Sequence, residues 1–152
     1  MAVNEHVAIA HELSAFLRRV ERFWAGFRAG KDGPVLERGA YLLLGQLASG
    51  GPRRLSAAAG DACLDLSTVS RQVASLEVAG LVSRSTDPTD RRAILVEVTQ
   101  AGHEALTRNR ETRQAALHDL LADWTSAERA EFARLFGRFN DAMARREQEI
   151  KR

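Results

Sequence analysis

The sequence predicts a mainly α-helical fold with one small β-hairpin. Three features predict it. Amphipathic helical patterns occupy both ends of the chain, a short helix, a tight turn and a second helix are expected in the middle, and two short β-branched runs follow them. The length of 152 residues suits one domain with a proper core and is too short for two ordinary domains.

The composition excludes several classes of protein. The chain is 45% hydrophobic and 28% charged. Its longest apolar run is well short of the ~20 residues needed to span a membrane, and the N-terminus does not have the pattern of a secretion signal. The single cysteine, Cys63, excludes an internal disulfide and multi-cysteine metal sites, so we expect a cytoplasmic protein without metal or cofactor. An enzyme finds no support, because the sequence shows neither a nucleophile–base pair nor a glycine-rich phosphate loop.

The charge balance does not by itself indicate a nucleic-acid partner. The net charge is +2, and the segment from Arg53 to Arg92 contains six arginines and five acidic residues. If the protein binds DNA, the positions of particular arginines must account for it, rather than their number.

The N-terminal part predicts two helices. Residues 5–27 carry apolar side chains in steps of three and four, which is typical of an amphipathic helix. The segment "AGKDGP" interrupts this pattern, and Pro34 is a suitable first residue for the next helix. That helix is nearly uncharged in its second half, so we expect it to be buried, and it ends at Ser49–Pro52.

A helix-turn-helix follows. Ser56 can cap a short helix that ends near Ala62, and Asp65 can cap a second helix, Leu66–Ala79, which stops at Gly80. The apolar stripe of the second helix consists of Leu66, Val69, Val73 and Leu76. Its outer, hydrogen-bonding face consists of Ser67, Thr68, Ser70, Arg71, Gln72 and Ser75.

A hairpin and two helices complete the chain. The strands are predicted at Leu81–Ser85 and Ala93–Thr99, joined by a loop longer than a two-residue turn requires. A helix begins at a Thr99 cap, and the capping box Thr125–Glu128 opens the last helix. The apolar stripe of the last helix consists of Phe132, Leu135, Phe136, Phe139 and Met143.

The segment Ser67–Gly102, "STVSRQVASLEVAGLVSRSTDPTDRRAILVEVTQAG", closely resembles the signature of MarR-type winged-helix transcriptional regulators. The second helix, the "GLV" exit, the "DPxDRR" wing and the "LxxVTxxG" return occur in order, and the flanking helices fit in number and order. The resemblance implies a single domain over 1–152. Within it we expect a winged helix-turn-helix lobe at 34–99, with a short extra strand near Arg54, and dimerisation helices at 5–33 and 100–149.

The resemblance also implies an obligate homodimer formed by the terminal helices. The aromatic residues of these helices, Phe16, Phe23, Trp24, Phe27, Phe132, Phe136 and Phe139, support it, since one thin helical layer could not bury them within its own subunit. The alternative is that these helices pack on their own lobe.

In a protein of this type the outer N-terminal residues of the second helix approach base edges in the major groove. The candidates here are Ser67, Thr68, Ser70, Arg71 and Gln72. Arg71 can pair bidentately with guanine and Gln72 with adenine, while hydroxyl groups bond phosphates. For Ser67 and Thr68 the alternative is a role in starting the helix, and we expect Ser75 to be solvated.

The wing is expected to reach the minor groove, whose negative potential attracts a cation. The resemblance implies that Arg92 enters the groove, that Asp90 holds the Arg92 guanidinium, and that Arg91 meets phosphate. The alternative is a solvated hairpin with an incidental ion pair. Arg53 and Arg54 are candidates for backbone contacts or merely solvated.

The resemblance further implies a transcriptional regulator, more often a repressor, that binds a pseudo-palindromic operator in double-stranded DNA. A small aromatic or phenolic effector would release the protein from this operator. His11, Phe16, Arg18 and Tyr41 are candidate effector-binding residues. Relatives usually have glycine where this chain has Cys63, and we expect that thiol to be buried and structural rather than redox-active. The competing hypothesis is a winged-helix protein-interaction module without specific DNA binding.

Overall fold

The computed structural model describes residues 4–26, 29–30, 33–34, 36–62 and 64–150. The chain forms two compact units that divide after Thr112. The helices are α1 (Glu5–Ala25), α2 (Arg38–Ala48), α3 (Leu55–Ala62), α4 (Leu66–Val78), α5 (Gln100–Leu120) and α6 (Ser126–Ile150). The strands are β1 (Ala29–Gly30), β2 (Gly33–Pro34), β3 (Arg53–Arg54), β4 (Val82–Asp87) and β5 (Asp90–Val98). Within these ranges no helix combines the length and the apolar character that a membrane crossing requires.

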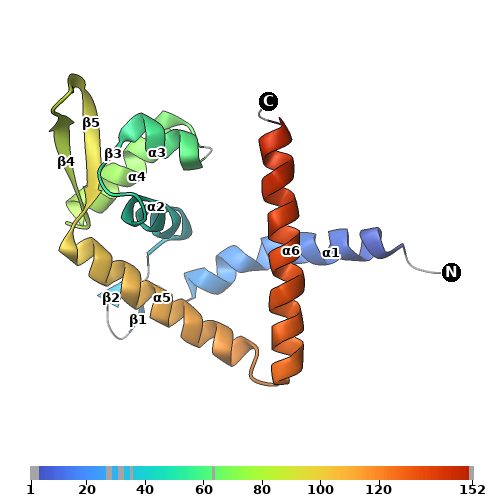
Figure 1. Ribbon diagram of the computed structural model, residues 1–152. Helices are drawn as coiled ribbons and strands as arrows, with labels where there is room; N and C mark the ends of the chain where they lie inside the picture. The colour runs from blue at the N-terminus through green and yellow to red at the C-terminus, as the bar shows by residue number, and fades with distance from the viewer. Residues whose placement is uncertain (1–3, 27–28, 31–32, 35, 63, 151–152) are drawn as a thin grey trace. The chain divides into compact units, whose positions relative to one another are not determined.

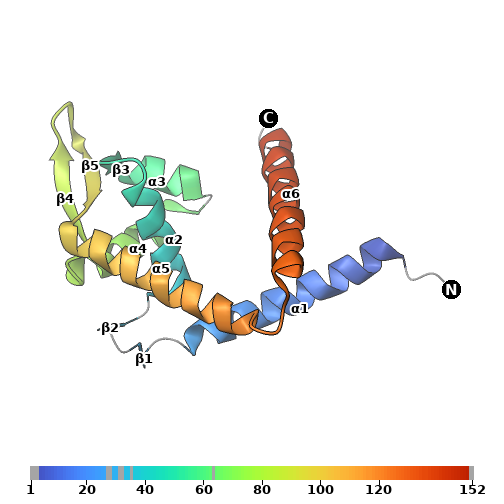
Figure 2. The same ribbon diagram turned by 60° about the horizontal axis from the view of Figure 1, so that its bottom comes forward.

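The fold is mainly helical with a three-stranded antiparallel sheet, as the sequence predicts. Strand β5 lies between β3 and β4, and β3 is the short extra strand expected near Arg54. The central lobe, which we define as α2–α4 with β3–β5, is the winged helix-turn-helix (Figure 1). The β4–β5 hairpin, called the wing below, extends past α3 in both ribbon views (Figure 2).

Two predicted helix starts are wrong. Pro34 does not open the second helix; it lies in β2, paired with Ala29, and α2 begins at Arg38 after Glu37. Ser56 does not cap α3, which already begins at Leu55, because the preceding two residues pair with β5 and run directly into the helix. Both errors arise because neighbouring residues pair as strands, which residue preferences at helix starts do not predict.

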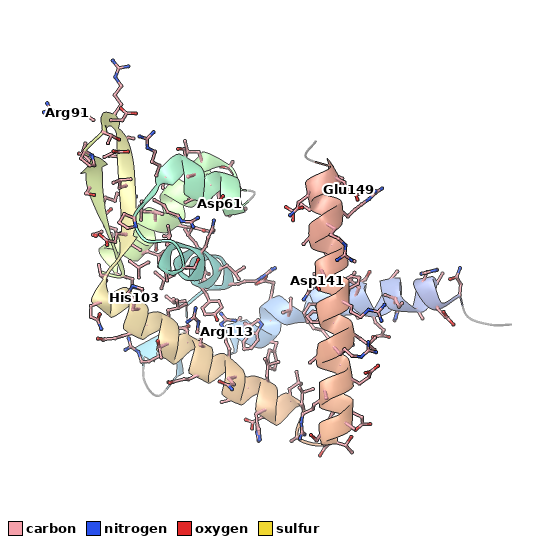
Figure 3. All side chains as sticks on the ribbon, in the orientation of Figure 1. Asp61, Arg91, His103, Arg113, Asp141 and Glu149 are labelled. Atoms are coloured by element: carbon pink, nitrogen blue, oxygen red, sulfur yellow. The ribbon has the colours of Figure 1, made fainter. Side chains whose placement is uncertain are left out.

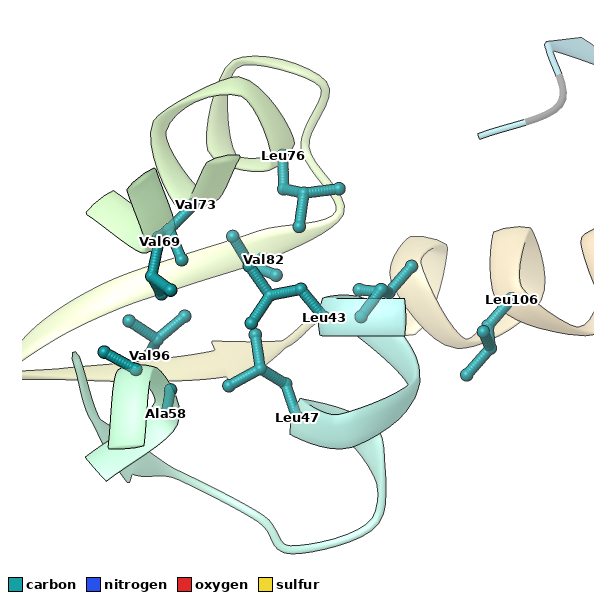
Figure 4. Packing of buried hydrophobic residues seen from close by; sticks show 11 residues of the cluster. Leu43, Leu47, Ala58, Val69, Val73, Leu76, Val82, Val96 and Leu106 are labelled. Atoms are coloured by element: carbon teal, nitrogen blue, oxygen red, sulfur yellow. The ribbon is translucent and has the colours of Figure 1, made fainter. Parts of the chain in front are cut away.

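The core of the lobe is a cluster of leucine, valine and alanine side chains from α2, α3, α4, β4, β5 and α5 (Figure 4). Leu44, Leu47, Val69, Val73 and Val96 are its largest fully buried side chains. Each contributes about 1.5–3 kcal/mol relative to an exposed position. The nearly uncharged α2 is therefore buried, as expected, whereas Leu66, expected in the α4 stripe, is 51% exposed.

The junction of α4, the wing and α5 is fixed by local chemistry. Gly80 ends α4 with a φ of 72°, in the left-handed region that glycine adopts readily. Thr99 caps α5 as predicted: its Oγ1 accepts the Gly102 N–H at 3.0 Å and donates to the Gly80 carbonyl at 2.7 Å. A Cβ at Gly102 would lie 2.1 Å from the Leu81 carbonyl oxygen, so this approach requires glycine.

The C-terminal unit carries exposed apolar side chains along α6. The capping box predicted at its start is confirmed, since Thr125 Oγ1 accepts the Glu128 N–H and Glu128 Oε2 accepts the Thr125 N–H at 2.7 Å. Helix α6 then has no buried residue over its whole length. Phe132 stacks on Phe136 and meets Trp124 edge to face, with ring centroids 5.6 and 5.5 Å apart.

Candidate nucleic-acid interface

The first turn of α4 is held by its own cap. Asp65 precedes the helix, and its carboxylate accepts the Thr68 N–H at 2.8 Å, the Thr68 hydroxyl at 2.7 Å and the Ser67 hydroxyl. These three donors, the Ser67 hydroxyl foremost, hold the pKa of Asp65 well below its usual range. The role in helix initiation therefore applies to both hydroxyls, although Ser67 remains exposed and accessible.

The outer face of α4 differs in part from the prediction. Arg71 and Ser75 are exposed and Ser70 is half-buried. Gln72 does not lie on this face: its side chain lies against α2, where a Cβ on Gly39 would come within 2.5 Å of Gln72 Nε2. Gln72 Oε1 is buried. Gln72 is therefore a contact between two helices of the lobe, and the adenine-reading role assigned to it does not fit this geometry.

The wing is built differently from the expected long loop. Thr86 pairs with Ile94, but the next pair is Asp87 with Asp90, so a two-residue turn, Pro88–Thr89, closes the hairpin. The additional length lies in β5, where the register shift leaves Arg91, Arg92 and Ala93 without opposite partners in β4. The irregularity thus displays two consecutive arginines just behind the turn.

Asp87 lies at the centre of the wing tip and is buried. Its Oδ1 accepts the Thr89 N–H at 2.8 Å and the Thr89 hydroxyl at 2.6 Å, while its Oδ2 lies 2.7 Å from both Nε and Nη2 of Arg54. These bonds, from Thr89 first and Arg54 next, lower the pKa of Asp87 to about 2. Asp87 therefore does more than shape the turn, because it joins the turn to β3.

The structure differs from two expectations, one for Asp90 and one for Arg54. Asp90 does not pair with the Arg92 guanidinium; its Oδ1 accepts the Arg92 backbone N–H at 3.1 Å, and its Oδ2 lies 3.9 Å from Arg54 Nη1. Arg54 is not merely solvated, since it holds both aspartates. Arg53 likewise pairs with Asp61 on α3 at 2.5 Å.

The arginines of β3, α4 and the wing consequently fall into two groups. Arg53, Arg54 and Arg84 each pair with a carboxylate, Arg84 with Glu77 at 3.0 Å. Arg71, Arg91 and Arg92 are exposed, and none has a carboxylate within 4.0 Å among the residues that the structure describes. Figure 3 shows Arg91 beside the wing tip, whereas Asp61 lies on α3. The unpaired cations lie on the helix and the hairpin expected to meet DNA.

The bonds of Asp87 predict a pH dependence. The folded-state pKa of about 2 lies below the ordinary 3.8, so the stabilisation is present above pH ~4 and is lost as the pH falls towards 2. We expect the urea midpoint of the native protein to exceed that of Asp87→Asn at pH 6, and the difference to shrink below pH ~4. Asp65 titrates in both proteins, so the comparison isolates Asp87. A difference that stays constant down to pH ~2 would exclude this contribution.

The candidate effector residues are not gathered into one site. His11, Phe16 and Arg18 are exposed on α1, where His11 Nδ1 lies 3.3 Å from Glu12 Oε1. Tyr41 packs against the core of the lobe from α2. Two open, shallow surface hollows lie elsewhere, one along α6 and one along α5. Cys63 falls outside the described residues, and the described ones contain no cluster suited to a metal ion.

Comparisons with known proteins agree with the geometry of the lobe. The model of the MarR family matches residues 36–94. The HTH-type transcriptional regulator YxaD of Bacillus subtilis (strain 168) is 38% identical over 134 residues, which are 88% of this chain and 92% of YxaD. The family prediction is therefore confirmed, and with it the prediction that the protein is not an enzyme.

Solved structures show the same fold. A crystal structure of MarR has a TM-score of 0.77 at 24% identity, covering 92% of this chain and 93% of that one. A mutant MarR from E. coli, complexed with operator DNA, has a TM-score of 0.68 at 18% identity, covering 91% of this chain and 98% of that one. A winged lobe with unpaired arginines on its second helix and wing, together with a relative that matches nearly end to end, gives one conclusion: the chain belongs to the MarR family of DNA-binding transcriptional regulators.

Proposed function

We propose that the protein is a homodimeric, cytoplasmic repressor that binds a pseudo-palindromic operator with α4 in the major groove and the wing in the minor groove. One observation carries the proposal. Arg71, Arg91 and Arg92 are exposed and have no acidic partner among the described residues, whereas Arg53, Arg54 and Arg84 each pair with a carboxylate of the lobe. A hairpin that was only solvated surface would have no reason to separate its arginines in this way.

In the major groove, Arg71 is the principal base-reading residue, because a guanidinium can bond guanine O6 and N7 together. Ser67 would act as an acceptor only. An ionised carboxylate cannot donate, so the hydroxyl proton of Ser67 is already given to Asp65. Its free lone pairs then suit an amino group, such as cytosine N4 or adenine N6, better than a phosphate oxygen. Thr68 is engaged in the same way, and Ser70 lies at the edge of the contact.

In the minor groove, Arg92 is the proposed inserted cation and Arg91 the phosphate contact. Both follow the two-residue turn and lie where β5 has no partner in β4, so sheet pairing does not hold this part of the strand. A narrow groove focuses negative potential on such a cation.

The apolar faces of the terminal helices support a homodimer. Along α6, Phe132 and Leu135 are each 47% exposed, and on α1 Phe16 is 50% exposed. A row of exposed apolar side chains along one helix, such as that on α6, is typical of a protein–protein interface. A two-fold dimer would place two lobes on half-sites about one helical turn apart. A small aromatic or phenolic effector that favours another lobe spacing would release the DNA.

A salt titration tests the proposal. The purified protein selects fragments from its own genome, and affinity for a selected fragment is measured between about 50 and 200 mM salt. We expect log affinity to fall steeply with log salt, at about 0.9 per neutralised phosphate. A flat dependence, or no selected fragment, would instead favour the protein-interaction module.

A further inference from the structure

We propose that Arg54 is a positioning residue that closes the wing tip and thereby orients Arg91 and Arg92, and that it makes no contact with DNA itself. The effect on the wing stands independently, whereas its consequence for operator binding rests on the function proposed above. The Arg54 side chain joins three parts of the lobe, namely β3, β4 and β5.

Arg54 connects the last residue of β4 to the first residue of β5. Its backbone pairs with Leu95, which anchors the residue in the sheet several positions behind the turn. Its side chain reaches forward to the buried Asp87, with Nε and Nη2 both at 2.7 Å from Oδ2. Its Nη1 lies 3.9 Å from Asp90 Oδ2. One guanidinium therefore fixes the residues on both sides of Pro88–Thr89.

The connection continues to the proposed DNA contacts. The other oxygen of Asp90 accepts the Arg92 backbone N–H at 3.1 Å. The segment Arg91–Ala93 has no opposite partners in β4, so ordinary sheet pairing does not hold it. The path from Arg54 through Asp90 to the Arg92 N–H is thus a polar anchor for an otherwise irregular segment. Fixing the backbone beforehand leaves less conformational entropy to be lost on binding.

Charge supports the same role. Two carboxylates at the tip of a DNA-binding hairpin would repel phosphates, and a guanidinium between them neutralises this repulsion. The Nε and Nη2 donors of Arg54 already point at Asp87, so they are not free for a phosphate. Arg54 acts from within the wing.

Limited trypsin digestion tests the positioning role without DNA. We expect cleavage after Arg91 or Arg92, identified by fragment mass, to be about tenfold faster in Arg54→Ala than in the native protein, because the tip opens more often. Arg54→Lys should be intermediate, since an ammonium cannot reproduce the forked contact. Arg53→Ala is the matched control: it removes the adjacent arginine and its pair with Asp61, and should leave cleavage at the tip unchanged.

Two digestion results would contradict the proposed role of Arg54 in closing the wing tip. One is an unchanged rate of tip cleavage in Arg54→Ala. The other is an increase shared equally by cleavage after Arg108 in α5, since that would show general unfolding. Arg54→Lys, which keeps the charge, provides the same test if the alanine variant does not fold.

Operator binding gives the second readout. Arg54→Ala is expected to weaken binding about tenfold and Arg92→Ala roughly 10- to 100-fold. The double variant should weaken binding by much less than the product of the two losses, because both substitutions remove the same contact. Losses that multiply, with a smaller salt slope for Arg54→Ala, would make Arg54 a direct phosphate contact and overturn the proposal. If the native protein binds no DNA, the proposed function is wrong, but the digestion still tests whether Arg54 closes the wing tip.

Discussion

Arg92→Ala is expected to lower operator affinity roughly 10- to 100-fold and to reduce the salt slope by about one for each subunit. The side chain is exposed, has no acidic partner among the described residues, and follows the turn of the wing. Its loss removes a cation from a region of concentrated negative potential, so the effect should weaken as salt rises. The measurement is a fluorescence anisotropy titration on a genome-selected operator at several salt concentrations.

Arg71→Ala provides the comparison, since it is expected to cost roughly 1–3 kcal/mol and to relax preference at one base pair in each half-site. Arg92→Ala should leave that preference intact. Asp90→Ala should weaken binding less than Arg92→Ala, because Asp90 acts only through the Arg92 backbone N–H. An Asp90→Ala protein that bound more tightly would show that repulsion by the carboxylate outweighs its positioning role. Equal salt slopes for native and Arg92→Ala proteins would remove Arg92 from the minor groove.

Features that depend on neighbouring residues were predictable from the sequence. The caps at Asp65, Thr99 and Thr125 and the stop at Gly80 lie where they were expected, because each depends on a side chain within about four residues of the helix end. The wing, its two exposed arginines and the short third strand were likewise anticipated.

Features that depend on distant residues were not. The bond between Arg54 and Asp87 joins positions 33 residues apart. The pairing of Asp90 with the Arg92 guanidinium, which the resemblance implied, is replaced by a bond to the Arg92 backbone N–H. A helical wheel places Gln72 on the outer face of α4. In the structure its side chain fits into the space that Gly39 of α2 leaves for want of a Cβ atom. A strand register is equally invisible when three residues such as Arg91–Ala93 lie outside the pairing. The sequence signal for the contact between Arg54 and Asp87 was an arginine just before the helix-turn-helix together with an acid at the hairpin tip.

Phe136→Asp is expected to convert the protein largely to monomer and to abolish detectable operator binding. Phe136 is 41% exposed and stacks on Phe132 along a helix without buried residues, and the proposed dimer would cover its remaining surface. Losing a buried phenylalanine costs about 3–5 kcal/mol, and a two-fold interface counts the change twice. A cost of about 6–10 kcal/mol would move the dissociation constant of a nanomolar dimer to between about 20 μM and the millimolar range.

Light scattering after size exclusion at about 10 μM protein measures this change. Ala130→Asp is the matched control, because it adds the same charge on the polar face of α6 and should leave both mass and operator affinity unchanged. Circular dichroism checks that the lobe stays folded, as its core contains no residue of α6. A monomeric Phe136→Asp protein that still bound the full operator with native affinity would show that one lobe suffices. In that case the apolar face of α6 would serve a partner other than a second copy of the chain, and the half-site spacing proposed for the operator would lose its basis.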